Sequence, residues 1–335
     1  MSANGVPDVL TYSRLARVVN ELKQQADTSR TETVTGQYAD ITSAVKGDIG
    51  GVHLIQKAID DAKIFQQNLS LAANRASGTQ AVLGNLTSES TRIGTSGLAS
   101  LAGDNSVGIE AVSVDAKSTL YTIFASLNTT AGGRALFAGD ATDTPPLGSV
   151  DDLLADVKAI IEGAVDAADA ATQLDLYFND PAGGFETTIY KGGAGDAPPV
   201  ELASGIRISA SVKANAQPIK DMIRSFAVLA NYESLPSGSA VERDKIANAA
   251  ASLALTAETN ITGMRAVLGV AEGRIADRQT QYEAEEIAMT GLYNSKVARD
   301  PYEAAAQLQL YETQLEASYL LTSRLSTLSL ANYLR

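Results

Sequence analysis

Few residues of this chain have the types and spacing that acid–base or metal chemistry needs. The single histidine, His53, has no cysteine and no second histidine near it, which argues against a role as a base or a metal ligand. The acidic pairs Asp60–Asp61 and Glu285–Glu286 are adjacent in sequence, and adjacent residues point to different faces of a helix. Two carboxylates that cannot meet at one substrate do not make a general acid and a general base. We therefore predict no catalytic residue, no metal and no cofactor.

Calcium-binding, phosphate-binding and thiolate sites also lack their key residues. Residues 192–196 resemble a single calcium-binding glycine repeat with its aspartate out of place, so we predict a turn there. No glycine-rich loop carries the lysine of a phosphate-binding loop, and the chain contains no cysteine. An enzyme housed in the middle of the chain stays as an alternative, although that region has acids but neither a histidine nor a paired nucleophile.

The net charge of −13 is concentrated in the middle of the chain. Between Gly139 and Gly205 there are 13 acidic residues and two lysines, which leaves −2 for the rest of the sequence. A phosphate backbone would repel this region, so we predict no nucleic-acid binding. No stretch approaches the ~20 apolar residues of a membrane span, and residues 1–10 lack the features of a secretory signal. We therefore expect no membrane contact and no cleaved signal peptide.

Both ends of the chain carry apolar side chains at the steps of three and four that mark one face of a helix. Near the N-terminus these are Tyr12, Leu15, Val19, Leu22 and Ala26. Near the C-terminus they are Leu308, Tyr311, Leu315, Leu321, Leu325 and Leu328, with Ser318 in one gap and with Tyr333 and Leu334 continuing the apolar character. Terminal residues that pack on nothing are normally polar, so we predict that these two stripes form a subunit interface.

Two arrangements of the terminal stripes stay open. In the first, both arms are largely disordered in the monomer and fold when they pack between subunits, because an isolated arm buries too little apolar surface to offset its backbone entropy. In the second, the two stripes form one helix pair inside a single chain.

A long helix is predicted behind the N-terminal arm. Apolar residues keep helical spacing over residues 51–93, and Gly94 and Gly97 are expected to begin a loop. A second helix is expected over residues 109–127. The two should form an antiparallel hairpin.

A second long helix is predicted before the C-terminal arm. Apolar residues advance by alternating threes and fours from Ile261 to Leu292, which is the spacing of a coiled coil. A helix over residues 239–297 would be ~90 Å long, so we expect a rod-like shaft. A new helix should then start at Asp300, because Asp300 can cap it, Pro301 suits its first turn and Glu303 can reach back to a free backbone amide.

The middle of the chain has a different pattern. Seven of the nine prolines lie within residues 145–236, which interrupts long helices there. We predict an acidic helix over residues 151–172, a hairpin formed by residues 175–178 and 185–190, and a half-buried strand over residues 206–212.

Together these patterns predict a mainly α protein, with an elongated antiparallel coiled-coil shaft built from both chain ends and an inserted small α+β outer domain. The predicted domains are an N-terminal assembly arm (residues 1–50), the first half of the shaft (51–138), the inserted acidic domain (139–238), the second half of the shaft (239–298) and a C-terminal assembly arm (299–335).

Three segments resemble the flagellin family of bacterial flagellar subunits. Residues 133–139, with the sequence Gly-Arg-Ala-Leu-Phe-Ala-Gly, and residues 142–146 after them resemble the exit from the first helical half in the hook–filament junction subunits of that family. Residues 264–269 resemble its last core helix, and residues 328–334 resemble its Ser-Leu-rich C-terminal end. These segments frame nearly the whole chain and leave the middle insert unmatched.

The resemblance implies a non-enzymatic structural subunit of the bacterial flagellum, exported through the flagellar type III pathway to an extracellular position. It implies a ring of copies of the chain between hook and filament, onto which flagellin polymerises. The implied partners are further copies of the chain, hook-associated protein 1, flagellin and a flagellar export chaperone. Flagellin itself, the filament subunit, stays as the alternative within the family.

Overall fold

The computed structural model describes residues 6–45, 48–103, 106–203, 205–209, 211–234 and 240–333. The chain divides into two compact units. The first unit consists of Met1–Lys63 and Glu283–Arg335, and the second unit is Ile64–Tyr282. Helices account for 78% of the structure, which confirms the predicted mainly α class.

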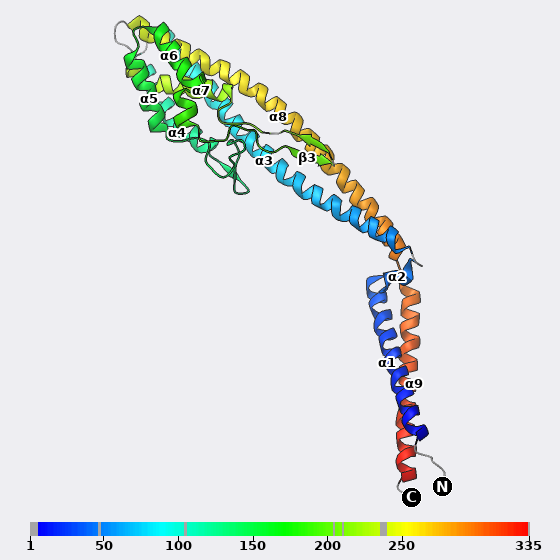
Figure 1. Ribbon diagram of the computed structural model, residues 1–335. Helices are drawn as coiled ribbons and strands as arrows, with labels where there is room; N and C mark the ends of the chain where they lie inside the picture. Colours follow the sequence, from blue (N-terminus) through cyan, green and yellow to red (C-terminus); the bar gives the residue numbers. More distant parts are fainter. Residues whose placement is uncertain are drawn as a thin grey trace. The chain divides into compact units, whose positions relative to one another are not determined.

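The first unit is built from helices. It contains α1 (Val6–Thr35), α2 (Ile41–Ala44), the beginning of α3 (Ile49–Ala102), the end of α8 (Ala240–Val297) and α9 (Pro301–Tyr333). The helices α1 and α9 lie side by side over most of their length (Figure 1).

The start of α9 follows the prediction at two of three residues. Pro301 is the first helical residue, and the Asp300 carboxylate accepts a hydrogen bond from the Tyr302 backbone N–H at 2.9 Å. Glu303, however, lies 3.5 Å from the Arg299 guanidinium and does not return to a free backbone amide. The Arg299 guanidinium is a stronger partner for the Glu303 carboxylate than a backbone amide, because both groups are charged.

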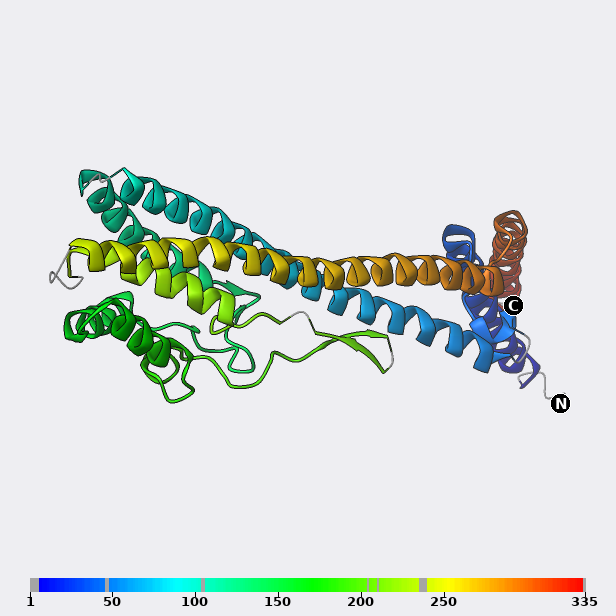
Figure 2. The ribbon, with the colours of Figure 1, turned by 90° about the horizontal axis from the view of Figure 1, so that it is seen from above.

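Two long antiparallel helix segments form the frame of the second unit (Figure 2). The Gln80 side chain of α3 donates to the Arg265 carbonyl of α8 at 3.0 Å, and the rings of Phe65 and Tyr282 stack with centroids 5.1 Å apart. Leu83 of α3 and Ile261, Leu268 and Ile275 of α8 are buried, as the predicted coiled-coil spacing requires. The end of the predicted row is wrong, because Leu292 is 45% exposed.

The predicted loop at Gly94 and Gly97 is wrong, because both glycines lie inside α3. A Cβ atom on Gly94 would lie 2.9 Å from the Leu255 side chain, and one on Gly97 would lie 3.1 Å from the Ala251 Cβ, both on α8. The glycines therefore allow α8 to approach α3 closely. The helix ends at Ala102 instead.

The predicted antiparallel hairpin of two helices is present after this later break. The second helix of the hairpin is α4 (Ser106–Leu127). The Arg92 guanidinium of α3 donates to the Thr119 hydroxyl of α4 at 2.9 Å and forms an ion pair with Asp115.

The middle of the chain adds short elements to this frame. They are β1 (Thr130–Ala131), β2 (Arg134–Ala135), α5 (Val150–Gly163), α6 (Ala167–Asn179), the π-helix η1 (Phe185–Ile189), β3 (Val200–Ala203), β4 (Ile206–Ile208), α7 (Gln217–Ala230) and the 3-10 helix η2 (Tyr232–Ser234). The predicted helix over residues 151–172 is therefore two helices. Asp166 separates them, and its carboxylate accepts a hydrogen bond from the Asp169 backbone N–H and so caps α6.

The predicted hairpin of residues 175–178 and 185–190 is wrong. Its first segment is the last turn of α6, and its second segment is η1. Phe178 and Phe185 are buried against each other with ring centroids 5.3 Å apart. Short apolar runs fit a buried helix as well as a strand, and burial in one core favours the helix here.

The predicted strand is present only at Ile206–Ile208, as β4. Its antiparallel partner β3 was not predicted. The expected alternation of burial is wrong too, because Ile206 is 48% exposed. Leu202 of β3 packs instead with Leu69 of α3 and Ile275 of α8 in a small separate cluster.

The helix α7, which the sequence analysis did not predict, lies at the centre of the main core. It buries residues on nearly all sides, namely Ile219, Met222, Ile223, Phe226, Ala227, Val228 and Leu229. Together with α3, α4, α5, α6 and α8 it forms one hydrophobic cluster. The inserted region therefore shares a core with the long helices.

One buried hydroxyl in this unit yields a stability prediction. Ser90 is fully buried, and its Oγ has no hydrogen-bond partner within the described part of the chain. Burying an unpaired hydroxyl is unfavourable, so Ser90→Ala is expected to raise the free energy of unfolding by about 1 kcal/mol. The measurement is urea denaturation of the full chain.

The matched control is Ser225→Ala, because Ser225 is also fully buried but donates to the Ala250 carbonyl at 2.6 Å. This change should lower the free energy of unfolding by about 1 kcal/mol. A loss of the same size for both variants would contradict the prediction for Ser90.

Candidate assembly interface

The N-terminal stripe faces α9 within the same chain. Along α1 the solvent exposure falls at every third or fourth residue. Leu15 and Val19 are half-buried, and Leu22, Ala26 and Ser29 are buried. Tyr12, at the start of the stripe, is exposed. The stripe predicted from the sequence is thus the contact face of α1.

The C-terminal stripe meets α1 along its first half. Leu308, Tyr311 and Leu315 are half-buried at the contact with α1, and Ser318 continues their row. Leu321 was predicted in this row but is 55% exposed, and Thr322 takes the half-buried position. A step of four from Ser318 returns to the same face, whereas a step of three falls beside it here. Leu325, Leu328, Tyr333 and Leu334 fall outside the side chains that the structure describes.

These positions correspond to the arrangement in which the two stripes form a helix pair inside one chain. An ion pair between Arg30 of α1 and Glu312 of α9, with N and O atoms 3.2 Å apart, crosses the same contact at its exposed edge. Such an exposed pair contributes little stability. The apolar row therefore provides most of the contact energy.

A buried polar cluster closes one end of the helix pair. The Glu32 carboxylate is 7% exposed, accepts a hydrogen bond from the Ala39 backbone N–H at 3.1 Å and lies 3.6 Å from the Arg299 Nε. The Arg299 guanidinium also lies over the Tyr38 ring and donates to its hydroxyl at 2.9 Å. This hydrogen bond is the main reason why the pKa of Arg299 is raised. Neither Glu32 nor Arg299 was singled out in the sequence analysis.

A signal for Glu32 was present in the sequence. Glu32 continues the row Leu22, Ala26, Ser29 by a further step of three, so a helical stripe predicts that it is buried. The backbone holds the cluster in place as well. Gly36 ends α1 with a φ of 66°, and its carbonyl accepts a hydrogen bond from the Arg299 N–H at 2.9 Å.

A second apolar face of α9 stays exposed. Tyr302, Leu310, Leu320 and Leu321 are each more than half exposed. Tyr302 and Leu320 are 18 residues apart and Leu310 and Leu321 are 11 apart, both close to whole numbers of helical turns. The two pairs lie about 80–100° apart around the axis, so all four fall on one side of the helix. The row that contacts α1 lies on the other side. We call these four residues the outer face of α9.

Among the residues considered for chemistry, one acid of each predicted pair faces a lysine. His53 is exposed. Asp61 pairs with Lys57 at 3.0 Å, and Glu286 lies 3.7 Å from Lys63. Within the described residues no group of three or more acidic, histidine or cysteine side chains could hold a metal ion.

Residues 192–196 form the predicted turn, next to Asp140. Lys213 closes this turn, because its ammonium donates to the Ala194 carbonyl at 3.0 Å and pairs with Asp196 at 3.4 Å. In the part of the chain that the structure describes, no helix has the length and apolar composition that crossing a bilayer requires.

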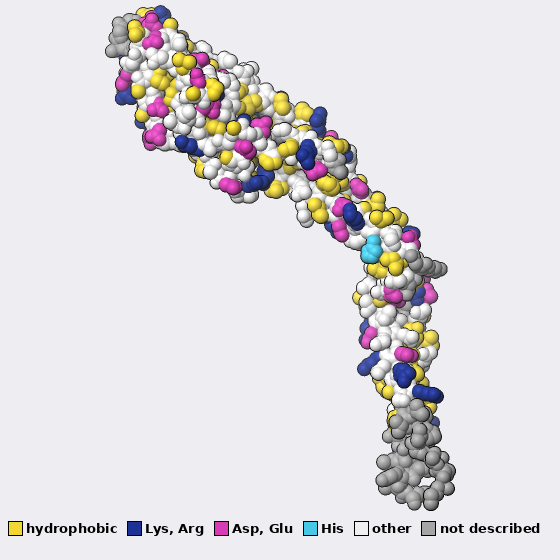
Figure 3. Space-filling view, viewed as in Figure 1, with side chains coloured by type: hydrophobic (Ala, Val, Ile, Leu, Met, Phe, Trp, Pro, Cys, Tyr) yellow, Lys and Arg dark blue, Asp and Glu magenta, His cyan; other side chains and the backbone are white. Residues whose placement is uncertain are grey.

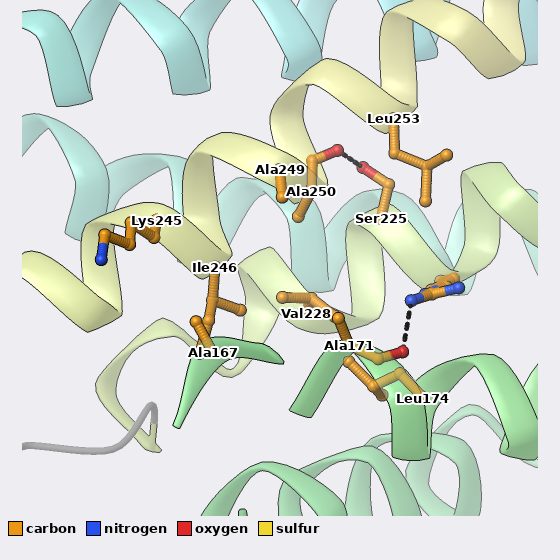
Figure 4. Close-up of a pocket in the computed structure, with 11 residues that line it drawn as sticks. Ala167, Ala171, Leu174, Ser225, Val228, Lys245, Ile246, Ala249, Ala250 and Leu253 are labelled. Carbon is orange, nitrogen blue, oxygen red and sulfur yellow. Dashed lines mark hydrogen bonds between the residues drawn. The ribbon is translucent and has the colours of Figure 1, made fainter. Parts of the chain in front are cut away.

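An apolar cavity lies between α6, α7 and α8 (Figure 4). Its walls come mainly from small and aliphatic side chains, including Ala171, Leu174 and Ile246. The polar groups at its edge are engaged elsewhere. Ser225 donates to a backbone carbonyl of α8, and Arg224 donates to the Ala171 carbonyl at 3.0 Å. The cavity offers packing space but no pair of groups suited to acid–base catalysis.

The C-terminal part of the chain matches the model of a known protein family. Residues 252–334 match a sequence model of the bacterial flagellin C-terminal helical region. This match confirms the resemblance to the flagellin family over most of α8 and the whole of α9. None of the curated proteins matches the sequence.

Solved structures of two flagellar proteins are similar to this chain. One, assigned as a flagellar hook-associated protein of Vibrio parahaemolyticus, has a TM-score of 0.48 at 13% identity and covers 73% of this chain and 95% of its own. The other is FlgL of Bacillus cereus, with a TM-score of 0.42 at 16% identity, covering 74% of this chain and 97% of its own.

Proposed function

We propose that this chain is a non-enzymatic structural subunit of the bacterial flagellum, a flagellin-family protein that forms the junction ring between hook and filament in the manner of hook-associated protein 3. The observation that carries the proposal is the outer face of α9. This helix already packs on α1 through one apolar row, yet keeps Leu310, Leu320 and Leu321 in contact with water. The match to the flagellin C-terminal region covers the same helix.

Covering the exposed outer face of α9 with another protein surface is energetically favourable. Burying a leucine or tyrosine side chain contributes about 1.5–3 kcal/mol, and the backbone of α9 is already ordered by α1. A neighbouring subunit that covers the outer face therefore gains this energy without the entropy of folding a free arm. We propose that the α1–α9 pair assembles as a unit, with Tyr12 and the C-terminal positions Leu325, Leu328, Tyr333 and Leu334 extending the subunit interface.

The predicted domain roles belong to the same proposal. Residues 1–50 and 299–335 act as the assembly arms, and residues 51–138 and 239–298 act as the two halves of the shaft. Residues 139–238 form the acidic outer domain. The expected partners are further copies of the chain, hook-associated protein 1, flagellin and an export chaperone. The expected location is the extracellular flagellum, reached through the flagellar export channel.

The test is complementation of a deletion strain, examined by electron microscopy. Deletion should leave bare hooks and release unpolymerised flagellin into the medium, and the unaltered gene should restore filaments. The double variant Leu310→Ser with Leu320→Ser should fail to restore them. Both side chains are exposed, so the free energy of unfolding should change by less than about 0.5 kcal/mol. Normal filaments on the deletion strain would exclude the junction role.

A matched control uses polar residues of the same helix. Gln314 and Glu316 are exposed on α9 and do not belong to its outer face. The double variant Gln314→Ser with Glu316→Ser should restore filaments fully. Equal loss of filaments with both double variants would count against the outer face as the interface.

Flagellin itself is the second candidate, because the matched family region is that of flagellin. The same strain separates the two roles. If the chain is the filament subunit, its deletion removes the polymerising protein, and the medium contains no other flagellin.

A further inference from the structure

A groove on the second unit is lined by two arginines that have no carboxylate partner among the described residues. It lies between α3, the segment around β2 and the chain that leads into β3. Its apolar walls include Leu71 of α3, Leu136 after β2, and Pro198 and Pro199 before β3. Leu71 is 43% exposed, so the apolar wall is open to solvent.

The two arginines are Arg75 of α3 and Arg134 of β2. The Arg75 side chain has no hydrogen bond or ion pair with any residue that the structure describes, and its Nε is shielded from solvent. Arg134 donates from its Nε to the Thr142 hydroxyl at 3.1 Å and has no ion pair within the described chain. Glu201 is the acid among the lining residues, and its carboxylate accepts a hydrogen bond from the Gly205 N–H at 3.3 Å. The lining side chains thus carry a net positive charge.

Three other cations of this unit illustrate the usual pairing with a carboxylate of the chain. Arg92 pairs with Glu89 at 2.6 Å, Lys220 pairs with Glu186 at 3.1 Å, and Arg224 pairs with an aspartate at 3.2 Å. Arg75 and Arg134 bring two guanidinium groups without an ion pair to a described residue into one groove, in a chain with a net charge of −13. A guanidinium binds a carboxylate through two parallel hydrogen bonds, which makes a carboxylate the best-matched ligand.

We propose that this groove binds an acidic segment of a second copy of the chain. The proposal rests on the proposed function, because a ring brings copies into contact. The donor region is present in every copy and lies outside the lining of the groove, since residues 143–196 contain 11 acidic residues and two lysines. Carboxylates such as Asp143, Asp152 and Asp180 are exposed there. Figure 3 shows acidic side chains spread over the surface of the part that α4–α7 form.

The walls of the groove favour a peptide segment over a free anion. Leucine and proline side chains contribute contact area that a small inorganic anion cannot use. The two guanidinium groups then fix the position of one or two carboxylates on that segment. Arg134 belongs to the Gly-Arg-Ala-Leu-Phe-Ala-Gly sequence, and its Nε bonds the Thr142 hydroxyl while its two terminal nitrogens have no hydrogen bond to the residues that the structure describes.

The test is site-specific photo-cross-linking of the full chain at high protein concentration. Because the chain has no cysteine, one introduced cysteine takes one benzophenone label. Asn68→Cys places the label in the groove, and Asn74→Cys is the matched control, since both asparagines are exposed on α3 and only Asn68 lines the groove. Cross-links from position 68 should reach peptides within residues 143–196 of another copy and be about tenfold more abundant than those from position 74.

A charge variant completes the test. Arg75→Gln together with Arg134→Gln should reduce the cross-links from position 68 about tenfold, while Arg274→Gln, on the exposed surface of α8, should leave them unchanged. Cross-links from position 68 to other regions, or no intermolecular cross-links from it, would overturn the proposal.

A label on the outer face of α9 distinguishes a failure of the groove proposal from a failure of the proposed function. Leu310→Cys reports assembly directly. Cross-links from position 310 without cross-links from position 68 would overturn the groove alone and leave the ring intact. Cross-links from position 68 without any from position 310 would support the groove and contradict the role of the outer face.

Discussion

Replacing Glu32 by glutamine is expected to destabilise the α1–α9 pair by about 2–3 kcal/mol, because the change removes the one buried carboxylate beside the Arg299 guanidinium and leaves only the exposed Glu303 carboxylate there. The Glu32 and Arg299 side chains are only 9% and 10% exposed, so water replaces little of the lost interaction. Glutamine keeps the shape of glutamate and can still accept the hydrogen bond from the Ala39 N–H. The effect therefore isolates the charge.

Hydrogen exchange of the full chain measures this effect. Amide protection should fall in α1 and α9 and stay unchanged in the second unit, because the cluster lies within the first unit. Glu312→Gln is the matched control. It removes an ion pair with Arg30 whose side chains are 59% and 50% exposed, and such pairs contribute about 0–1 kcal/mol. Equal effects of the two changes would show that burial of the cluster contributes nothing.

Gly139→Ala is expected to lower the free energy of unfolding by about 3 kcal/mol or more. Gly139 has a φ of 63°, a conformation that costs an L-residue about 1–2 kcal/mol. In addition, a Cβ atom there would lie 2.3 Å from the Gly195 carbonyl oxygen, a backbone atom that cannot rotate away. The chain must therefore shift at the turn formed by residues 192–196.

The matched control is Gly133→Ala, in the same segment. Gly133 has a φ of 76°, but a Cβ atom there would have no heavy atom within 4 Å. This change should cost about 1 kcal/mol, from the backbone conformation alone. Urea denaturation of both variants measures the difference, which is the contribution of the close contact. Equal losses would mean that the turn moves aside freely.

The long helices were predictable because their pattern is local. A row such as Ile261, Leu268 and Ile275 repeats at the period of the helix, and each of these residues is buried. The two glycines of α3 were predicted wrongly because their role depends on contacts with a distant segment. Gly94 and Gly97 stand where α8 comes close, and their neighbours Leu255 and Ala251 are more than 150 positions away in the sequence. Glycine occurs both in loops and at close helix contacts, so the residue type alone does not distinguish the two.

The short elements of the middle region were harder to predict. Phe178 and Phe185 belong to a core that six helices share, so tertiary burial decided their helical state. The helix α7 could have been predicted. Pro218 lies in its first turn, and Ile219, Met222 and Phe226 follow at steps of three and four.

The sequence by itself determined which residues share a face on each terminal helix, because the helical period relates a side chain only to its own axis. It did not determine which of the two apolar faces of α9 meets α1. The tertiary structure decided that Leu308, Tyr311 and Leu315 turn inward and that Leu310 and Leu320 stay exposed. It also decided that Glu32 meets Arg299, 267 positions later. Such pairings depend on contacts between distant segments, and a local pattern carries no information about them.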